Sequence, residues 1–516
     1  MNKILCLLMS ACIALSSTAQ VKIDRSKPPK VGPAPSIVFA DPVTFTLPNG
    51  MTIIVVENHK LPKVSATLNI DMGPVLEGKK AGVMQLMGQM LSEGTTSMPK
   101  AKFDEAIDLL GADVNLFSGG GSASALTRYF NQAFNLMADA LKKPAFPQES
   151  FEKLKSQYIT SLKSGEKSAA TISGRVVSAL SYGKNTAMGE FETEETIKGI
   201  TLDDVKEAYK NYITPSRSYL TFVGDITPGK AKELAISAFN AWTGRKLTLS
   251  QIRNVENVGS TEIDFIDLPT AVQGEISVTN LVNNPMSNPD YHALLLANQI
   301  LGGGAESKLF MNLREKHGFT YGSYSNIGNG RFQSQFKSSA AVRSDKADSA
   351  VVEMLREIEN MRNGNITAEE LAIAKAKYNG SFALGMEDPA NTARYASNIL
   401  INNLSKDFYR TFLQKINGVS VEDIKKVSQK YFEKDKSRIV MVGNGSKIIP
   451  NLARLGYPIK KYDKYAEPVV DKPKETEVKE SSKTTDAISA YSVIEGYLKA
   501  IGGKEEVKKV NTLKTS

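Results

Sequence analysis

The sequence predicts an α+β protein made of two copies of one unit, each a mixed or antiparallel sheet covered by helices. Three observations support this fold class. The chain has 516 residues, more than a single hydrophobic core usually holds. Strand-like and helix-like patterns follow one another along it, and one long segment occurs twice. The hydrophobic content of 41% is ordinary for a globular protein.

The recurring segment is the strongest of these observations. Residues 199–224, GITLDDVKEAYKNYITPSRSYLTFVG, align without gaps on residues 418–443, GVSVEDIKKVSQKYFEKDKSRIVMVG, at an offset of 219 (418 − 199). In each copy Thr201 or Ser420 precedes acidic residues, as at the N-terminus of a helix. A hydrophobic strand that closes on Val-Gly follows. The match indicates two units of roughly 200 residues each.

The flanking segments differ from these units in composition. Lys3, an apolar run and the small residues before Gln20 are typical of a secretory signal, so we expect an exported chain, periplasmic or associated with the envelope. Cys12 as a lipid attachment site is the alternative. Both cysteines lie in this signal, so the cleaved chain would have no thiol.

The prolines that follow predict an extended arm, and the charged, Ser/Thr-rich run after Pro468 predicts a disordered linker. The expected division is 1–19 signal peptide, 20–40 arm, 41–245 first domain, 246–261 linker, 262–466 second domain, 467–486 linker, and 487–516 a helical tail or the start of a truncated third module.

Charge and hydropathy exclude two classes of protein. The formal charge of +9 (64 Lys and Arg against 55 Asp and Glu) is dispersed along the chain. No basic stretch is interleaved with aromatic residues, so we expect no nucleic-acid partner. No run of about 18 apolar residues occurs after the signal, so we expect no transmembrane helix.

The elements of the first unit follow from local patterns. Two β-rich runs around Pro48-Asn49-Gly50 predict a hairpin, and alternation over 64–72 predicts another strand. Apolar residues at helical spacing predict helices over 81–91, 102–110, 132–141 and 148–162, with a turn at 118–121. The second unit is expected to hold a strand over 275–279, a helix over 289–301, strands near Ser325 and Phe336, and helices from 344, 367 and 388.

The stretch Leu301–Tyr321, LGGGAESKLFMNLREKHGFTY, stands out in the second unit. Its apolar spacing predicts a helix over 308–316, and Gly318 lies where a glycine ends a helix. Arg314 would then lie near the end of this helix, and Tyr321 would open the next strand. We expect the two side chains to converge on one point.

These features together resemble the pitrilysin/insulinase family of zinc peptidases, the inverzincins, over about residues 40–460. The resemblance implies two homologous domains that form a clamshell. AGVMQLMGQMLSEGT (81–95) is similar to the metal-binding helix of the family, H-x-x-E-H. Gln85 and Gln89 stand where the family has its histidines, and Gly88 stands where it has the catalytic glutamate. A carboxamide is a poor zinc ligand and glycine cannot act as a base, so no metal is expected in this chain.

The resemblance places the family's distal glutamate near FEKLKSQYI (151–159), where Lys153, Lys155 and Ser156 stand; Glu152 is close but is not assigned to that position. The three histidines, His59, His292 and His317, lack ligand spacing.

The second unit, by contrast, matches the R-E-x-x-G-x-x-Y pattern of the family at Arg314 and Tyr321. The resemblance implies that these two residues act catalytically in trans to the metal of a partner, as donors to the oxygen that becomes negative during hydrolysis or to the substrate backbone. Alternatively, Arg314 pairs with Glu315 or Glu306 and Tyr321 belongs to the core. Asn115 matches an asparagine that binds substrate backbone in the family, and a turn asparagine explains it equally well.

Three functions remain open from the sequence. The first is an exported homologue, catalytically incomplete alone, that supplies Arg314 and Tyr321 to a zinc-bearing partner subunit of the same family for peptide hydrolysis. The second is a non-catalytic peptide-binding or scaffold protein of the cell envelope. The third is an independent metallopeptidase with substitute ligands.

Overall fold

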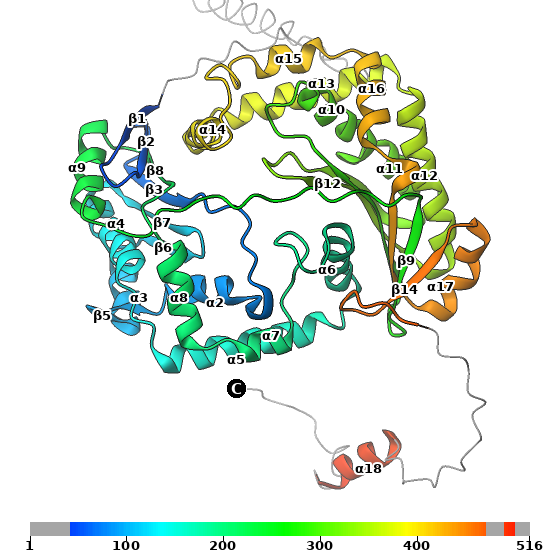
Figure 1. Ribbon diagram of the computed structural model, residues 1–516, viewed down its shortest axis with the longest axis horizontal. Coiled ribbons are helices and arrows are strands. Elements are labelled where there is room, and N and C mark those ends of the chain that lie inside the picture. Colours follow the sequence, from blue (N-terminus) through cyan, green and yellow to red (C-terminus); the bar gives the residue numbers. More distant parts are fainter. Residues whose placement is uncertain (1–41, 471–489, 501–516) are drawn as a thin grey trace, which may run out of the picture. The chain divides into compact units, whose positions relative to one another are not determined.

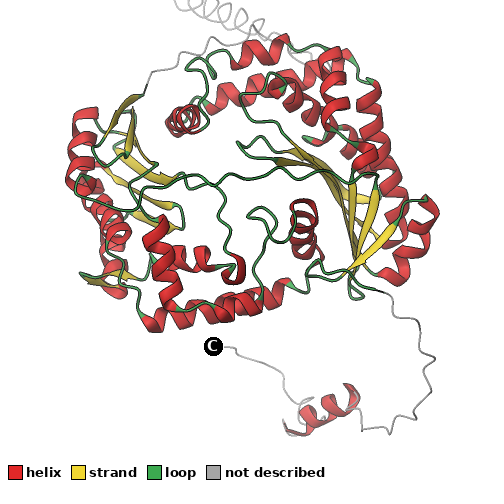
Figure 2. Ribbon diagram, viewed as in Figure 1, coloured by secondary structure: helices red, strands yellow, loops and turns green. Residues whose placement is uncertain are grey.

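The computed structural model describes residues 42–470 and 490–500, and Figures 1 and 2 show its helices and strands. The strands of the first half are β1 (Val43–Thr46), β2 (Thr52–Glu57), β3 (Lys63–Ile70), β4 (Gly94–Thr95), β5 (Met98–Pro99), β6 (Asp113–Phe117), β7 (Gly120–Leu126) and β8 (Ser218–Gly224). Its helices are α2 (Val83–Met90), α3 (Lys100–Leu109), α4 (Thr127–Lys142), α5 (Gln148–Gly165), α6 (Ala169–Tyr182), α7 (Glu194–Gly199), α8 (Leu202–Tyr212) and α9 (Pro228–Phe239).

The second half repeats this alternation. Its strands are β9 (Glu262–Asp267), β10 (Gln273–Val282), β11 (Thr320–Ile327), β12 (Ser334–Arg343), β13 (Arg438–Gly443) and β14 (Ile459–Tyr462). Its helices are α10 (Tyr291–Gly302), α11 (Lys308–Phe310), α12 (Ala347–Asn363), α13 (Ala368–Gly385), α14 (Pro389–Ile401), α15 (Phe412–Gly418), α16 (Val421–Tyr431) and α17 (Gly445–Leu452). A separate unit contributes α18 (Ala490–Ala500).

Several predicted segments fall where the structure describes nothing. The signal, the arm, most of the 467–486 linker and most of the tail lie outside the described residues. Within the described ranges, every helix is too short or too polar to cross a bilayer.

The two halves contain six-stranded sheets with matching strand order, β1-β2-β8-β3-β7-β6 and β14-β9-β13-β10-β12-β11. The strand from the repeated segment lies inside each sheet. β8 is parallel to β2 and antiparallel to β3, and β13 is parallel to β9 and antiparallel to β10. The predicted α+β class with two related mixed sheets is therefore confirmed.

The repeated helices also begin in the same way. Thr201 accepts from the backbone N–H of Asp204, whose carboxylate accepts from the Thr201 backbone N–H, and this reciprocal capping box begins α8. Ser420 and Asp423 form the same box at the start of α16. The cap chemistry expected from the sequence is thus present in both copies.

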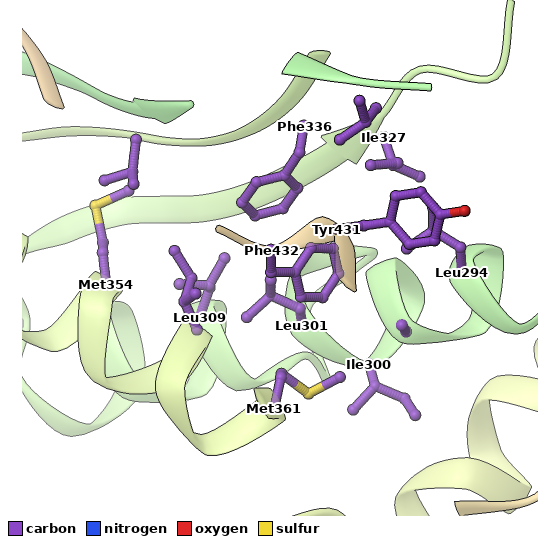
Figure 3. Close-up of a cluster of buried hydrophobic side chains, with 14 of the residues drawn as sticks. Leu294, Ile300, Leu301, Leu309, Ile327, Phe336, Met354, Met361, Tyr431 and Phe432 are labelled. Atoms are coloured by element: carbon purple, nitrogen blue, oxygen red, sulfur yellow. The ribbon is translucent and has the colours of Figure 1, made fainter. Parts of the chain in front are cut away.

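Helices cover the outer face of each sheet. α4 and α9 contact the first sheet, and α10 and α12 contact the second. Figure 3 shows part of the second core, where Leu309 of α11 lies in one cluster with Phe336 of β12 and Phe432. The rings of Phe336 and Phe432 have their centroids 4.5 Å apart. The short helix that starts the Arg314 segment is therefore anchored in the core by Leu309.

The halves exchange a helix across the inner faces of the sheets, as Figure 1 shows. α6 belongs to the first half but packs against β10 and β13 of the second sheet. α14 belongs to the second half but packs against β2 and β8 of the first. Sequence patterns predicted α14 but gave no sign of this exchange.

An ion-pair cluster joins the halves beside α14. Arg331 of the second half donates to both carboxylate oxygens of Asp71, at 2.9 Å and 2.5 Å, and to the carbonyl of Ile401. Arg217 also pairs with Asp71. Burial alone would raise the pKa of Asp71, but hydrogen bonds from the two arginines outweigh burial and lower it.

Candidate functional site

The helix α2 carries the three positions where metal chemistry would be expected. Gln85 has its side chain against Tyr158 of α5, whose hydroxyl lies 2.9 Å from Gln85 Oε1 and 2.8 Å from Glu192 Oε1. A phenol has one proton, so it donates to one of these oxygens at a time. Gln89 Oε1 is buried and makes no hydrogen bond within the described residues.

Gly88 lies where α2 meets the turn between β6 and β7. A Cβ at this position would stand 2.5 Å from the backbone nitrogen of Ser118 and 3.1 Å from the carbonyl carbon of Phe117. Both atoms belong to the backbone, so they cannot rotate away as a flexible side chain could. The turn therefore fills the space that a glutamate at position 88 would need.

Carboxylates near this helix are engaged in holding the backbone. Glu77 Oε2 accepts from the backbone N–H groups of Gly82 and Met84 at 2.9 and 3.0 Å, at the start of α2. Glu190 accepts from the backbone N–H of Glu77 at 2.6 Å. Burial raises the pKa of Glu77, and the charges of Glu190 and Glu192 add to that effect.

These residues do not fit a zinc ion. The two expected ligand positions on α2, Gln85 and Gln89, provide carboxamides, and the side chain that contacts Gln85 is the phenol of Tyr158. Zinc prefers imidazole, thiolate and carboxylate ligands. Burial, followed by the charge of Glu192, raises the pKa of Tyr158, so its hydroxyl is a neutral donor. In the part of the chain that the structure describes, no three His, Cys, Asp or Glu side chains gather in a way that could hold a metal.

Arg314 lies in the predicted helix, which the structure winds in an unexpected way. α11 has only three α-helical residues and continues as a π-helical segment over Met311–Lys316. Gly318, with φ of +62°, ends it as expected. Isolated π turns occur often at functional sites. The apolar spacing used for the prediction does not distinguish the two windings.

The Arg314 side chain is half exposed, at 47%. Its guanidinium lies 4.8 Å from the centre of the Phe310 ring, and its Nε lies 3.4 Å from a Glu315 oxygen. Such surface pairs are weak. The predicted alternative partner, Glu306, pairs instead with Lys377.

Tyr321 is on β11, an edge strand of the second sheet. The pairing of β11 with β12 shifts register between Thr320 and Ser323, and a bulge of this kind re-aims a side chain. Thr320 Oγ1 stabilises the bulge, since it accepts from the backbone N–H of Gly322. Tyr321 is 86% exposed as a result, so the interpretation of Tyr321 as a core residue is wrong. The described contacts include none between Tyr321 and Arg314, and their convergence stays a prediction.

A buried network lies beneath this segment. Asn312 Nδ2, in the π-helical segment, donates to the carboxylates of Glu353, at 3.0 Å, and Glu357, both on α12. Arg356 balances part of their charge by donating to Glu353. Asn312 therefore ties the segment that carries Arg314 to a core helix.

Asn115 is an exposed residue of β6, the edge strand of the first sheet that lies next to α2. It pairs in register with Ser122 of β7 and is not a turn residue. Among the described residues, no strand pairs with the outer edge of β6; an extended peptide could add there, which is consistent with the predicted contact to a substrate backbone.

The histidines lie apart, each in a different setting. His59 is exposed and contacts Glu57 and Asp225. His292 is buried against the rings of Phe408 and Phe412. His317 stacks on Phe319.

The fold and this site define a class of protein: a chain with the two-domain architecture of a zinc peptidase whose metal helix has lost its ligands. Family models identify it. The model described as insulinase (peptidase family M16) matches residues 52–188, and the model described as peptidase M16 inactive domain matches residues 199–378. The chain belongs to the insulinase family, peptidase family M16.

Curated relatives and solved structures agree with this assignment. An uncharacterized zinc protease YmxG from Bacillus subtilis is 22% identical over 78% of this chain and 98% of its own length. A non-peptidase homolog YmxG from Helicobacter pylori is 23% identical over 77% of this chain and 92% of its own. A crystal structure of a peptidase M16 inactive domain from Pseudomonas fluorescens shares the fold, with a TM-score of 0.72 at 23% identity, over 78% of this chain and 98% of its own.

Sequence reasoning missed two residues of this site. Tyr158 lies inside the FEKLKSQYI stretch searched for a carboxylate, and it occupies the side of α5 that faces Gln85. Glu192 is far from the motif in sequence. Tyr158 could have been found from the sequence, because a phenol hydroxyl can hydrogen-bond a carboxamide at the place where a carboxylate would have bound a metal.

Proposed function

We propose that this chain is the non-metal subunit of a two-chain peptidase, catalytically incomplete alone, and that it supplies Arg314 and Tyr321 to the active site of a zinc-bearing insulinase-family partner. The observation that carries the proposal is an asymmetry between the halves. The first half has its metal positions blocked by its own Tyr158 and Ser118. The second keeps Arg314 and Tyr321 at the surface.

The chemistry of the two residues suits this role. Hydrolysis of a peptide bond places negative charge on the carbonyl oxygen, and a guanidinium with a phenol hydroxyl can donate to it or to the substrate backbone. Zinc and its ligands would come from the partner. Asn115, on an exposed strand edge, would hold the backbone of a peptide substrate.

The test uses the chain purified with its zinc-bearing partner. Arg314→Ala and Tyr321→Phe should each lower kcat for peptide cleavage by about 100-fold, the loss typical of removing one such donor, without changing co-elution of the two chains. Lys316→Ala and Tyr324→Phe are matched controls on the same segment and strand, and they should keep full activity. Full cleavage by the Arg314→Ala/Tyr321→Phe double variant would refute the proposal.

A second candidate function is a non-catalytic peptide-binding or scaffold protein. Each sheet ends in a strand, β6 or β11, whose outer edge pairs with no strand in the described part of the chain, and such edges capture extended peptides by strand addition. This function predicts complexes whose members lack any H-x-x-E-H helix. Affinity purification that returns zinc-bearing relatives in stoichiometric amount would contradict it.

We also propose export, to the periplasm or the envelope, because residues 1–19 have the composition of a secretory signal. Cell fractionation with an antibody against the chain tests this. Recovery of a chain that still carries residues 1–19, in the cytoplasmic fraction, would contradict it.

A further inference from the structure

The two exchanged helices meet the sheets in different ways. α6 seals the second sheet, because Ile172 and Val176 pack in one buried cluster with Val440 and Val442 of β13. The repeat alignment places Thr221 of β8 at the position of Val440, since 440 − 219 = 221. A hydroxyl thus replaces an apolar contact at the equivalent point of the first sheet.

α14 packs on β2 and β8 but leaves a pocket beneath it. It has a volume of about 620 Å³ and lies between α14 and the inner faces of β3 and β8. α14 presents small side chains to it, including Ala393 and Ser397. A pocket of this size falls in the range that holds small ligands.

The floor of the pocket is a row of hydrogen-bonding side chains. Ser65, Thr67 and Asn69 alternate along the inner face of β3, and Thr221 lies beside them on β8. Among the described residues, none hydrogen-bonds the side chains of Thr67, Asn69 or Thr221. The backbone of β3 is paired on both sides, with β7 and β8, so a guest would be held by side chains.

Charge is uneven around the pocket. Lys60 and Lys63 line the pocket where β3 begins. Neither lysine has an ion-pair partner in the described part of the chain. Two acids and a third cation, Arg394 of α14, also line it. Asp388 caps α14 by accepting from the Ala390 N–H, while Glu387 is exposed. Leu61 and Ala390 add apolar wall.

We propose that this pocket binds a short extended peptide, with a free carboxylate or acidic side chain near Lys60 and Lys63. The polar row from Ser65 to Asn69 covers four residue steps, or about 13 Å at about 3.3 Å per residue. An extended peptide has the same spacing, so its amide groups and alternate side chains match the row. The two unpaired lysines provide the counter-charge.

Peptide binding here does not depend on Arg314 and Tyr321 or on a partner. The experiment therefore uses the full chain alone. The probe is a dye-labelled pool of random hexapeptides that end in aspartate with a free carboxylate, measured by fluorescence anisotropy. The matched pool ends in asparagine amide.

The expected result is saturable binding of the acidic pool, at least five-fold tighter than the amide pool. Lys60→Ala/Lys63→Ala should remove that difference, whereas Lys79→Ala, at an exposed lysine away from the pocket, should preserve it. Thr67→Val should weaken both pools several-fold, and Ser397→Trp, which fills the pocket, should abolish binding while thermal unfolding stays unchanged.

Two results would overturn the inference: no saturable binding by the parent chain, or equal binding by the parent chain and Ser397→Trp. The Arg314→Ala/Tyr321→Phe double variant separates this inference from the proposed function. It should bind the acidic pool like the parent chain even if it abolishes cleavage with the partner, and loss of its binding would also contradict the inference.

Discussion

The close contact between Gly88 and the β6–β7 turn predicts that adding a single methyl group at position 88 will destabilise the chain. In a helix interior, Gly→Ala normally gains about 1 kcal/mol from helix propensity. At Gly88 the new Cβ would lie 2.5 Å from the Ser118 nitrogen, and forcing atoms into a packed interior costs about 1–3 kcal/mol. We expect Gly88→Ala to destabilise the first half by about 1 kcal/mol. A half of this size would then melt about 2 °C lower.

Gly174 provides a matched control. It is also inside a helix, α6, but a Cβ there would meet no atom within 4 Å. Gly174→Ala should therefore raise the melting temperature where Gly88→Ala lowers it, as followed by circular dichroism. If both substitutions stabilise the chain equally, the turn at Ser118 moves at little cost, and the predicted destabilisation by Gly88→Ala is wrong.

The same contact predicts the outcome of restoring the motif. Gln85→His/Gly88→Glu/Gln89→His must move the β6–β7 turn, so it should melt below Gln85→His/Gln89→His and show no peptidase activity on its own. The prediction would be refuted by a triple variant that has the same melting temperature as the double variant and cleaves peptides.

Four further substitutions test other parts of the fold. Asp71→Asn should lower the free energy of unfolding by about 2–3 kcal/mol near neutral pH, because it leaves Arg331 without its buried partner. The pKa of Asp71 is lowered in the folded chain, so the stabilisation is present above about pH 4 and is lost as the pH falls through the folded pKa. Urea unfolding of both chains from pH 7 to 3 tests this, and a difference that stays constant with pH would contradict it. Thr201→Ala and Ser420→Ala should each cost about 1 kcal/mol in denaturant unfolding, and unequal losses would argue against equivalent caps. Asn312→Asp places a third carboxylate between the two of α12 and should lower the melting temperature more at pH 8 than at pH 4, whereas a pH-independent loss would indicate a packing effect alone.

Local patterns predicted much of the fold, for reasons visible in particular residues. The repeat was detectable because both capping boxes and both strands are continuous in sequence, and the family assignment followed from the residues around Gln85 and Arg314. The helix exchange was not detectable, since the apolar residues of α6, such as Val176, show that one face is buried but not against which sheet. The bulge that exposes Tyr321 was missed for a related reason: it depends on the register with β12.

The exchanged helices also bear on whether the duplicated chain could be divided. If the second half were expressed alone, the valines of β13 that α6 now covers would meet water, and a bared apolar sheet face of this kind promotes aggregation. The first half alone would bare a mixed face, on which Ile54 of β2 and Val223 of β8 lie beside the hydroxyl of Thr221. Division of the chain would therefore expose apolar sheet residues in both halves, with one more of them on β13, where Val440 stands at the position that Thr221 has on β8.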